Sequence, residues 1–258
     1  MNKMREKNSR RRSGQVLVIA VLVVSLVLLS TQLYIYEVGK SLRVKSVHVN
    51  DFVLAMRLGS QHTVTGSLAN ISVGGDDSVL LANLQRWAAF TGGLYQFGKP
   101  VLTFTLENTP PYVNGTYLSW GTDGFGVTSA YANFTFSLLD SQVTTQSSYA
   151  VNVTTSLLVE GFYRRVDLLT TEVNVICTVL NDGEPALAEN VTVLYKRLEA
   201  WFRADALDSY SFTDYGNGTY QISFRESYLP LETINVSAQI YDLRGIYAQA
   251  NVTCTEIP

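Results

Sequence analysis

The sequence is poor in the residues that most often build catalytic and metal sites. Its 258 residues include two cysteines and two histidines, and neither His48 nor His62 has a cysteine or carboxylate at metal-ligand spacing. G-x-S-x-G, H-E-x-x-H and the complete phosphate-binding motif G-x-x-x-x-G-K-[ST] are absent from the chain. We therefore expect a non-enzymatic protein with no catalytic residue, no cofactor and no bound metal.

Basic residues are also scarce outside the N-terminus. Six of the nineteen Lys and Arg residues lie within the first twelve positions, and acidic residues outnumber basic ones in the rest of the chain. Nucleic-acid binding needs grouped cations to neutralise phosphates. This distribution predicts no nucleic-acid partner.

One long stretch without formal charge follows the basic leader. Residues 15–36 carry no Lys, Arg, Asp or Glu, and a helix of that length spans a bilayer core about 30 Å thick. The basic residues on its N-terminal side predict a cytoplasmic leader over 1–14, a transmembrane helix over 15–36 and an extracellular remainder. A cleaved secretory signal ending near Ser30 is disfavoured, because Leu28 stands where such a site needs a small residue. The lipid bilayer is thus an expected partner, with the chain in the cell membrane as a single-pass protein.

Beyond this stretch, helical spacing predicts a stalk or linker region over 37–98. Its first helix continues the membrane segment, with a break near Gly39. A second helix follows "GGDDS", where Asp77 or Ser78 serves as its cap and Gly92-Gly93 ends it. Its expected apolar face is Leu80, Leu81, Leu84, Trp87 and Ala88.

From Pro100 onward the apolar residues alternate with a period of two, which is typical of half-buried strands. We expect a small β-rich domain over 99–164 and an all-β sandwich over 165–258. Together with the helices this predicts a membrane-anchored α+β protein. Trp120, in the turn-rich segment between two strands, is either an exposed contact or a plug that closes the sheet against the helix.

Both cysteines occupy the apolar phase of their strands. Cys177 and Cys254 should therefore point into one core, which favours an inter-sheet disulfide in an oxidising compartment. Two free, buried thiols are the alternative.

N-x-S/T sequons occur more often than the composition alone accounts for. They predict a glycoprotein with a glycan-covered outer surface, since glycans need exposed acceptors. The alternative is that Asn and Thr only decorate solvent-facing strand positions. The eight acceptors are Asn70, Asn114, Asn133, Asn152, Asn190, Asn217, Asn235 and Asn251.

Two segments resemble known families. The order "CTVLNDGEPALAENVTVLY", "DYGNGTYQISF" and "INVSAQIYDLRGIYAQANVT" is similar to invasin-type bacterial Ig-like domains and implies a spacer or binding module. At the N-terminus, "RRRSG" followed by "QVLVIAVLVVSLVLL" resembles the class III signal of archaeal type IV pilin-like and TadE-like proteins. That resemblance implies cleavage between Gly14 and Gln15 and packing of the helix into a filament core. Two residues depart from the pattern, since Ser13 stands where a basic residue is usual and Ile19 where many such subunits have Glu. These departures favour a minor or tip subunit, or a surface protein that never polymerises.

These observations predict a membrane-anchored cell-surface protein with a pilin-like structural or adhesive role. Its expected partners besides lipid are other pilin-like subunits or surface proteins. The alternative is an anchored extracellular module that binds a ligand or partner and never polymerises.

Overall fold

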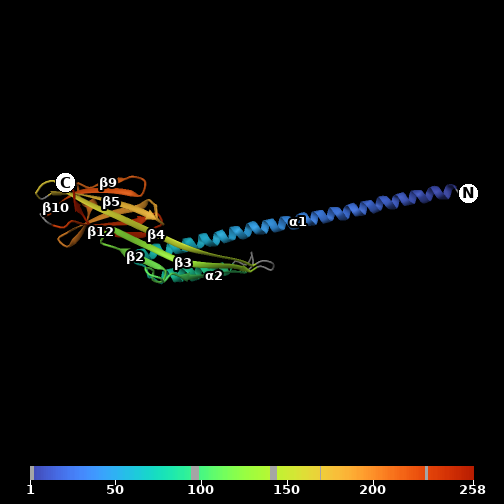
Figure 1. Ribbon diagram of the computed structural model, residues 1–258, viewed down its shortest axis with the longest axis horizontal. Helices are drawn as coiled ribbons and strands as arrows, with labels where there is room; N and C mark the ends of the chain where they lie inside the picture. The colour runs from blue at the N-terminus through green and yellow to red at the C-terminus, as the bar shows by residue number, and fades with distance from the viewer. Residues whose placement is uncertain (1–2, 94–98, 140–143, 169, 230–231) are drawn as a thin grey trace. The chain divides into compact units, whose positions relative to one another are not determined.

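The computed structural model describes residues 3–93, 99–139, 144–168, 170–229 and 232–258 (Figure 1). Within helix α1 (Lys3–Ser72), the side chains of residues 3–20 and 38–50 lie outside this description. The chain divides into two compact units, Met1–Leu54 and Ala55–Pro258. They are called the N-terminal and the C-terminal unit below.

The N-terminal unit is built from α1, which continues without a break past Gly39. Among the described residues, no helix is long and apolar enough to cross a membrane. This finding contradicts the predicted transmembrane helix over 15–36 and the predicted single-pass location in a cell membrane, so both predictions are wrong.

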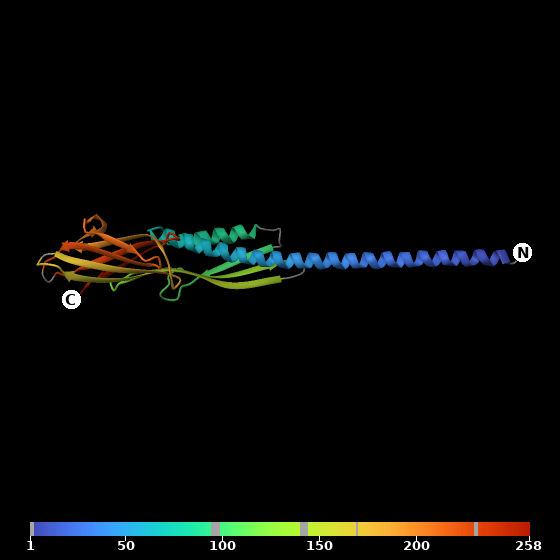
Figure 2. The same cartoon turned by 90° about the horizontal axis from the view of Figure 1, so that it is seen from above.

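The C-terminal unit begins with a pair of helices, the last turns of α1 and α2 (Val79–Gly92), which lie side by side (Figure 2). Ser78 is the N-cap residue of α2, as predicted, but its side chain makes no capping bond. Asp76 stabilises the turn instead, because its Oδ1 accepts a 2.7 Å bond from the Ser78 N–H. Leu80 and Leu84 are buried as predicted, whereas Leu81 is exposed.

After α2, the described residues form thirteen strands in two sheets. The nine-stranded sheet has the order β1-β3-β4-β5-β10-β9, with β13 on β4, β2 on β3 and β6 on β5, and the four-stranded sheet has the order β12-β11-β7-β8. All pairs are antiparallel except β13 with β4. The bounds are β1 (Lys99–Leu106), β2 (Thr116–Trp120), β3 (Phe125–Leu139), β4 (Thr144–Arg165), β5 (Thr170–Asn181), β6 (Glu184–Pro185), β7 (Ala188–Arg197), β8 (Ala200–Arg203), β9 (Ser211–Asp214), β10 (Thr219–Ser227), β11 (Asn235–Asp242), β12 (Tyr247–Thr253) and β13 (Thr255–Glu256), with a short 3-10 helix at Ala204–Ala206.

The predicted α+β class is wrong, because the protein is mostly β-sheet. The period-two alternation continues after Pro100 through both predicted β regions. Strands of both regions lie in the nine-stranded sheet. Strand β4 crosses residues 164 and 165, where a domain boundary was expected, and pairs with β3 on one side and β5 on the other. Ala55 to Pro258 form a single compact unit.

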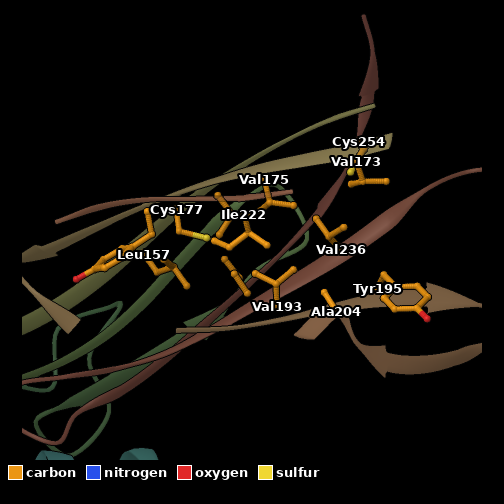
Figure 3. Packing of buried hydrophobic residues seen from close by; sticks show 14 of the residues in the cluster. Leu157, Val173, Val175, Cys177, Val193, Tyr195, Ala204, Ile222, Val236 and Cys254 are labelled. Atoms are coloured by element: carbon orange, nitrogen blue, oxygen red, sulfur yellow. The ribbon is translucent and has the colours of Figure 1, made fainter. Parts of the chain in front are cut away.

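The two sheets pack face to face around a buried apolar cluster (Figure 3). Alternate residues of β5, such as Val173 and Val175, face alternate residues of β11, such as Val236, and each is fully buried. Strands β4, β7, β10 and β12 complete this core. A period-two pattern on each strand is sufficient for this arrangement, because each sheet buries one face.

A second core lies where the helix pair covers the other end of the large sheet. Strand β1 packs beside α2. Tyr149 of β4 stacks on Phe134 of β3 with ring centroids 5.3 Å apart, and its hydroxyl lies 3.0 Å from Ser60 Oγ of α1. Burial also raises the pKa of the Tyr149 hydroxyl.

One buried acid ties the β11–β12 turn to the large sheet. Asp242 is fully buried, and its Oδ2 accepts bonds of 2.8 Å from Thr155 Oγ1 and from Arg244 Nε. Arg244 also donates to the carbonyl of Thr154 and to Asp182 Oδ2, both at 2.9 Å. The carboxylate is thus paired and hydrogen-bonded, which is the condition under which a buried charge is tolerated.

Candidate functional site

The most unusual surface of the N-terminal unit is an apolar helical segment, residues 21–36 of α1. Its ten aliphatic side chains are all exposed, each by 53% to 68%. Because they occupy nearly consecutive positions, they cover every side of the helix rather than one stripe. They are Val21, Leu22, Val23, Val24, Leu26, Val27, Leu28, Leu29, Leu33 and Ile35.

The serine and threonine hydroxyls within this segment bond back to the helix. Ser25 Oγ donates to the carbonyl of Val21, and Thr31 Oγ1 donates to that of Val27, both at 2.9 Å. The polar hydrogens of these two hydroxyls are therefore used inside the helix. The predicted processing residues, Gly14 and Gln15, fall within α1, but their side chains lie outside the described residues.

None of the eight sequon asparagines is buried. Six are exposed and two, Asn235 and Asn251, are half-buried. Asn114 occupies a turn with a φ of 50°, followed by Gly115 at 79°. Asn70 is exposed near the end of α1, although the hydroxyl residue of its sequon, Ser72, is 1% exposed. The exposed six are Asn70, Asn114, Asn133, Asn152, Asn190 and Asn217.

The two half-buried sequons interlock on the outer face of the small sheet. Asn235 lies directly opposite Thr253, and Ser237 lies opposite Asn251. Thr253 Oγ1 donates a 2.8 Å bond to Asn235 Oδ1, and Gln249 Nε2 bonds to both Ser237 Oγ and Asn251 Oδ1. Each acceptor thus faces the hydroxyl residue of the other sequon, so access to both is narrower than at the other six.

The two cysteines are buried and free, and the structure does not bring them together as a disulfide. Cys177 lies near Leu157 and Ile222, whereas Cys254 lies beside Val173 (Figure 3). Cys177 and Val173 are four positions apart on one strand, which corresponds to about 13 Å and exceeds the reach of a disulfide. Burial raises the pKa of both thiols to about 12.

Trp120 is partly exposed and contacts residues of two strands. It is 39% exposed, and its ring meets Tyr247 edge to face with centroids 5.2 Å apart. Its Nε1 donates to Thr128 Oγ1 at 3.3 Å. Burial raises the pKa of Tyr247 to about 12.

A groove on the helix pair was not predicted. It has a volume of about 550 Å³ and is lined from α1 by His62, Thr63, Gly66 and Ser67 and from α2 by Asn83, Arg86, Trp87 and Phe90. The α2 residues recur at helical spacing, so the sequence does indicate that they share one face of the helix. Trp87 was expected to be only part of the apolar face, and the partner helix that makes the groove could not be inferred from spacing alone.

Within the described residues, no group of three or more His, Cys, Asp or Glu is placed to hold a metal ion. A scan against protein-family models found no match to the chain, and a search of curated proteins found no significantly similar sequence. The arguments about function therefore depend on the residues and their arrangement.

Proposed function

We propose that this protein is a non-enzymatic structural or adhesive subunit that assembles with further copies through residues 21–36 of α1, in the manner of pilin-like proteins. The exposed apolar side chains that surround this helix carry the proposal. Fully burying one Leu or Val side chain is worth about 1.5 to 3 kcal/mol, so this segment has a large free energy to gain from neighbours.

The distribution of these side chains indicates how many neighbours are needed. One partner helix can bury a stripe of apolar residues, whereas several helices are needed to bury an apolar surface on all sides. Leu28 and Leu29 are consecutive and both about 60% exposed, so they point to different sides. A bundle of identical helices buries all of these faces at once, which supports a polymeric role.

The C-terminal unit is the part that such an assembly would display. It has its own cores, and six of its sequon asparagines are exposed and two half-buried. Glycans on these positions would cover much of the β surface. This combination suits a durable, non-catalytic surface component with an adhesive role.

A ligand-binding module that never polymerises is the second candidate. The groove on the helix pair favours it, because that groove lies within the C-terminal unit and needs no second copy. In this case the apolar segment of α1 would be covered by a different protein.

Mass spectrometry of the native N-terminus and electron microscopy of sheared filament fractions test the proposal. We expect a mature chain that begins at Gln15 and fibres that contain it. Leu28→Glu should remove the protein from the sheared fraction, since it places a charge in the helix bundle. The matched control is Leu243→Glu, at a leucine of the C-terminal unit that is 67% exposed. An intact Met1 start, or assembly that withstands Leu28→Glu, would contradict the proposal.

Glycan occupancy is tested separately on native peptides. We expect added mass at the six exposed acceptors and lower occupancy at Asn235 and Asn251, because of their interlocked sequons. Unmodified masses at all eight positions would remove glycosylation from the proposal.

A further inference from the structure

The groove between α1 and α2 has features of a ligand site that a packing defect would not have. Its volume, about 550 Å³, is in the range of small-molecule sites. It is open to solvent, and its lining combines two aromatic rings with hydroxyl, amide, imidazole and guanidinium groups. None of its described lining residues is acidic.

The aromatic part of the groove is held in a fixed position. Trp87 Nε1 donates to Ser60 Oγ at 3.0 Å, and the indole lies so close to Gly59 that a methyl group there would overlap it. Phe90 stacks on Trp87 with centroids 5.7 Å apart and ring planes 23° apart. Phe90 is 60% exposed, so the stack presents an accessible ring face to solvent.

The polar part of the groove is formed by side chains of the same two helices. Asn83 Nδ2 donates to Ser67 Oγ at 3.0 Å, and this hydroxyl in turn donates to the carbonyl of Thr63, which orients the amide. A methyl group on Gly66 would meet no atom within 4 Å, so the α1 side of the groove leaves room beside the amide.

Arg86 supplies the charge of the groove. Within the described part of the chain, no acid forms an ion pair with its guanidinium. By contrast, Arg203 is paired with Asp205 and Arg225 with Glu172. A guanidinium is well suited to a carboxylate, because its N–H donors match the two oxygens.

We propose that this groove binds a short acidic saccharide, with one sugar ring stacked on Phe90 and its carboxylate held by Arg86. The apolar face of a pyranose matches an aromatic ring, and its hydroxyls match the Asn83 amide and the neighbouring hydroxyls. The inference rests on the adhesive role in the proposed function and gives its ligand class. A nucleic acid is less suitable, because one guanidinium and an acidic chain do not provide the grouped cations that a phosphate backbone needs.

The test is binding of trigalacturonate to the full-length protein, with maltotriose as the neutral probe of equal length. In a Trp120→Phe, Trp201→Phe background, Trp87 is the only remaining tryptophan, and its fluorescence reports on the groove. We expect saturable quenching by trigalacturonate and at least tenfold weaker binding of maltotriose. Calorimetry on the unaltered chain should give the same affinity.

Two substitutions separate the charge from the ring. Arg86→Ala should weaken trigalacturonate binding at least tenfold and leave maltotriose unchanged, whereas Phe90→Ala should weaken both. The matched controls are Arg203→Ala and Phe212→Ala, at an exposed arginine and an exposed phenylalanine of the sheets. Neither control should change binding, and unchanged unfolding curves should show that each variant is folded.

Several results would overturn the inference. The first is the absence of saturable binding. The second is trigalacturonate binding by Arg86→Ala and by Phe90→Ala that is as tight as binding by the unaltered protein. The third is tighter binding of hexathymidylate than of trigalacturonate. Assembly is read independently from the sheared fraction. A protein that assembles but binds no saccharide removes only this inference, whereas one that binds but never assembles removes only the polymeric role.

Discussion

The two units use the same aliphatic residues in opposite ways. Leu28, in the N-terminal unit, is 61% exposed, whereas Leu157, in the sandwich core, is 0% exposed. Consecutive aliphatic residues on a helix point to all sides, so one neighbouring layer cannot cover them. Alternating residues on a strand all point to one side, so a second sheet covers them completely. The spacing of apolar residues, more than their number, decides whether their side chains are buried by the same chain or need another chain to cover them.

The comparison is tested most directly by making the same substitution in both units. Leu157→Ala should lower the free energy of unfolding by about 2 to 5 kcal/mol, because it removes buried methyl groups and leaves a cavity. Leu28→Ala should change it by less than about 0.5 kcal/mol, since an exposed side chain loses little. Urea unfolding followed by tryptophan fluorescence measures both, because all three tryptophans lie in the C-terminal unit. Equal effects would contradict the comparison.

The two cysteines test how completely the sandwich core excludes solvent and reagents. A rise in the thiol pKa from 9.0 to about 12 lowers the thiolate fraction of Cys177 and Cys254. The reduction is roughly a thousandfold at pH 8. We expect neither cysteine to react with iodoacetamide in the folded protein.

Both cysteines should react after unfolding without a reductant, which corresponds to the free thiols of the structure. If alkylation in denaturant occurs only after reduction, the predicted disulfide forms instead.

Two glycines test the difference between crowded and open positions. Gly161→Ala should destabilise the protein by about 1 to 3 kcal/mol, because the new methyl group would lie 2.6 Å from Cys254 Sγ. Gly66→Ala should stabilise it by up to about 1 kcal/mol, since a helical glycine is replaced where no atom lies within 4 Å. Melting temperatures of the two variants should therefore move in opposite directions.

The smallest expected effect lies on the exposed face of the large sheet. Hydrogen bonds from Arg164 and Arg225 lower the pKa of Glu172 in the folded protein. Its stabilisation is therefore present above the unfolded pKa of about 4.3 and is lost as the pH falls through the lower folded value. Glu172→Gln should cost about 0.5 to 1 kcal/mol at pH 7 and almost nothing at pH 2. Glu199→Gln, at a side chain 89% exposed, is the control, and an equal cost at both pH values would refute this account.

Much of the local structure could be predicted from the sequence, because it depends on near neighbours. The second helix, its end at Gly92-Gly93 and the hairpin around "GNG" are set by spacing and turn residues. The burial of Ile222 and Phe224 likewise follows from their strand phase. The predicted membrane span over 15–36 was wrong, because no helix of the described residues is long and apolar enough to cross a membrane.

Long-range arrangement was the main source of error in the fold. The predicted boundary at 164 and 165 falls inside β4, whose pairing with β3 and β5 joins the two expected domains. Sequence alternation has the same form in one large sheet and in two small ones. Alternation also placed both cysteines in a core, yet it did not predict that Cys254 lies beside Val173, four positions along β5 from Cys177.

By itself, the sequence determined the period of each segment, the exposure of most sequon asparagines and the apolar surface of residues 21–36, since these depend on residues close together in the chain. Only the tertiary structure decided that strands of both predicted β domains share the nine-stranded sheet, that the thiols lie apart, and that Arg86 and Phe90 line a groove. Each of these depends on segments that are distant in the chain, and their contacts are set by packing rather than by local spacing.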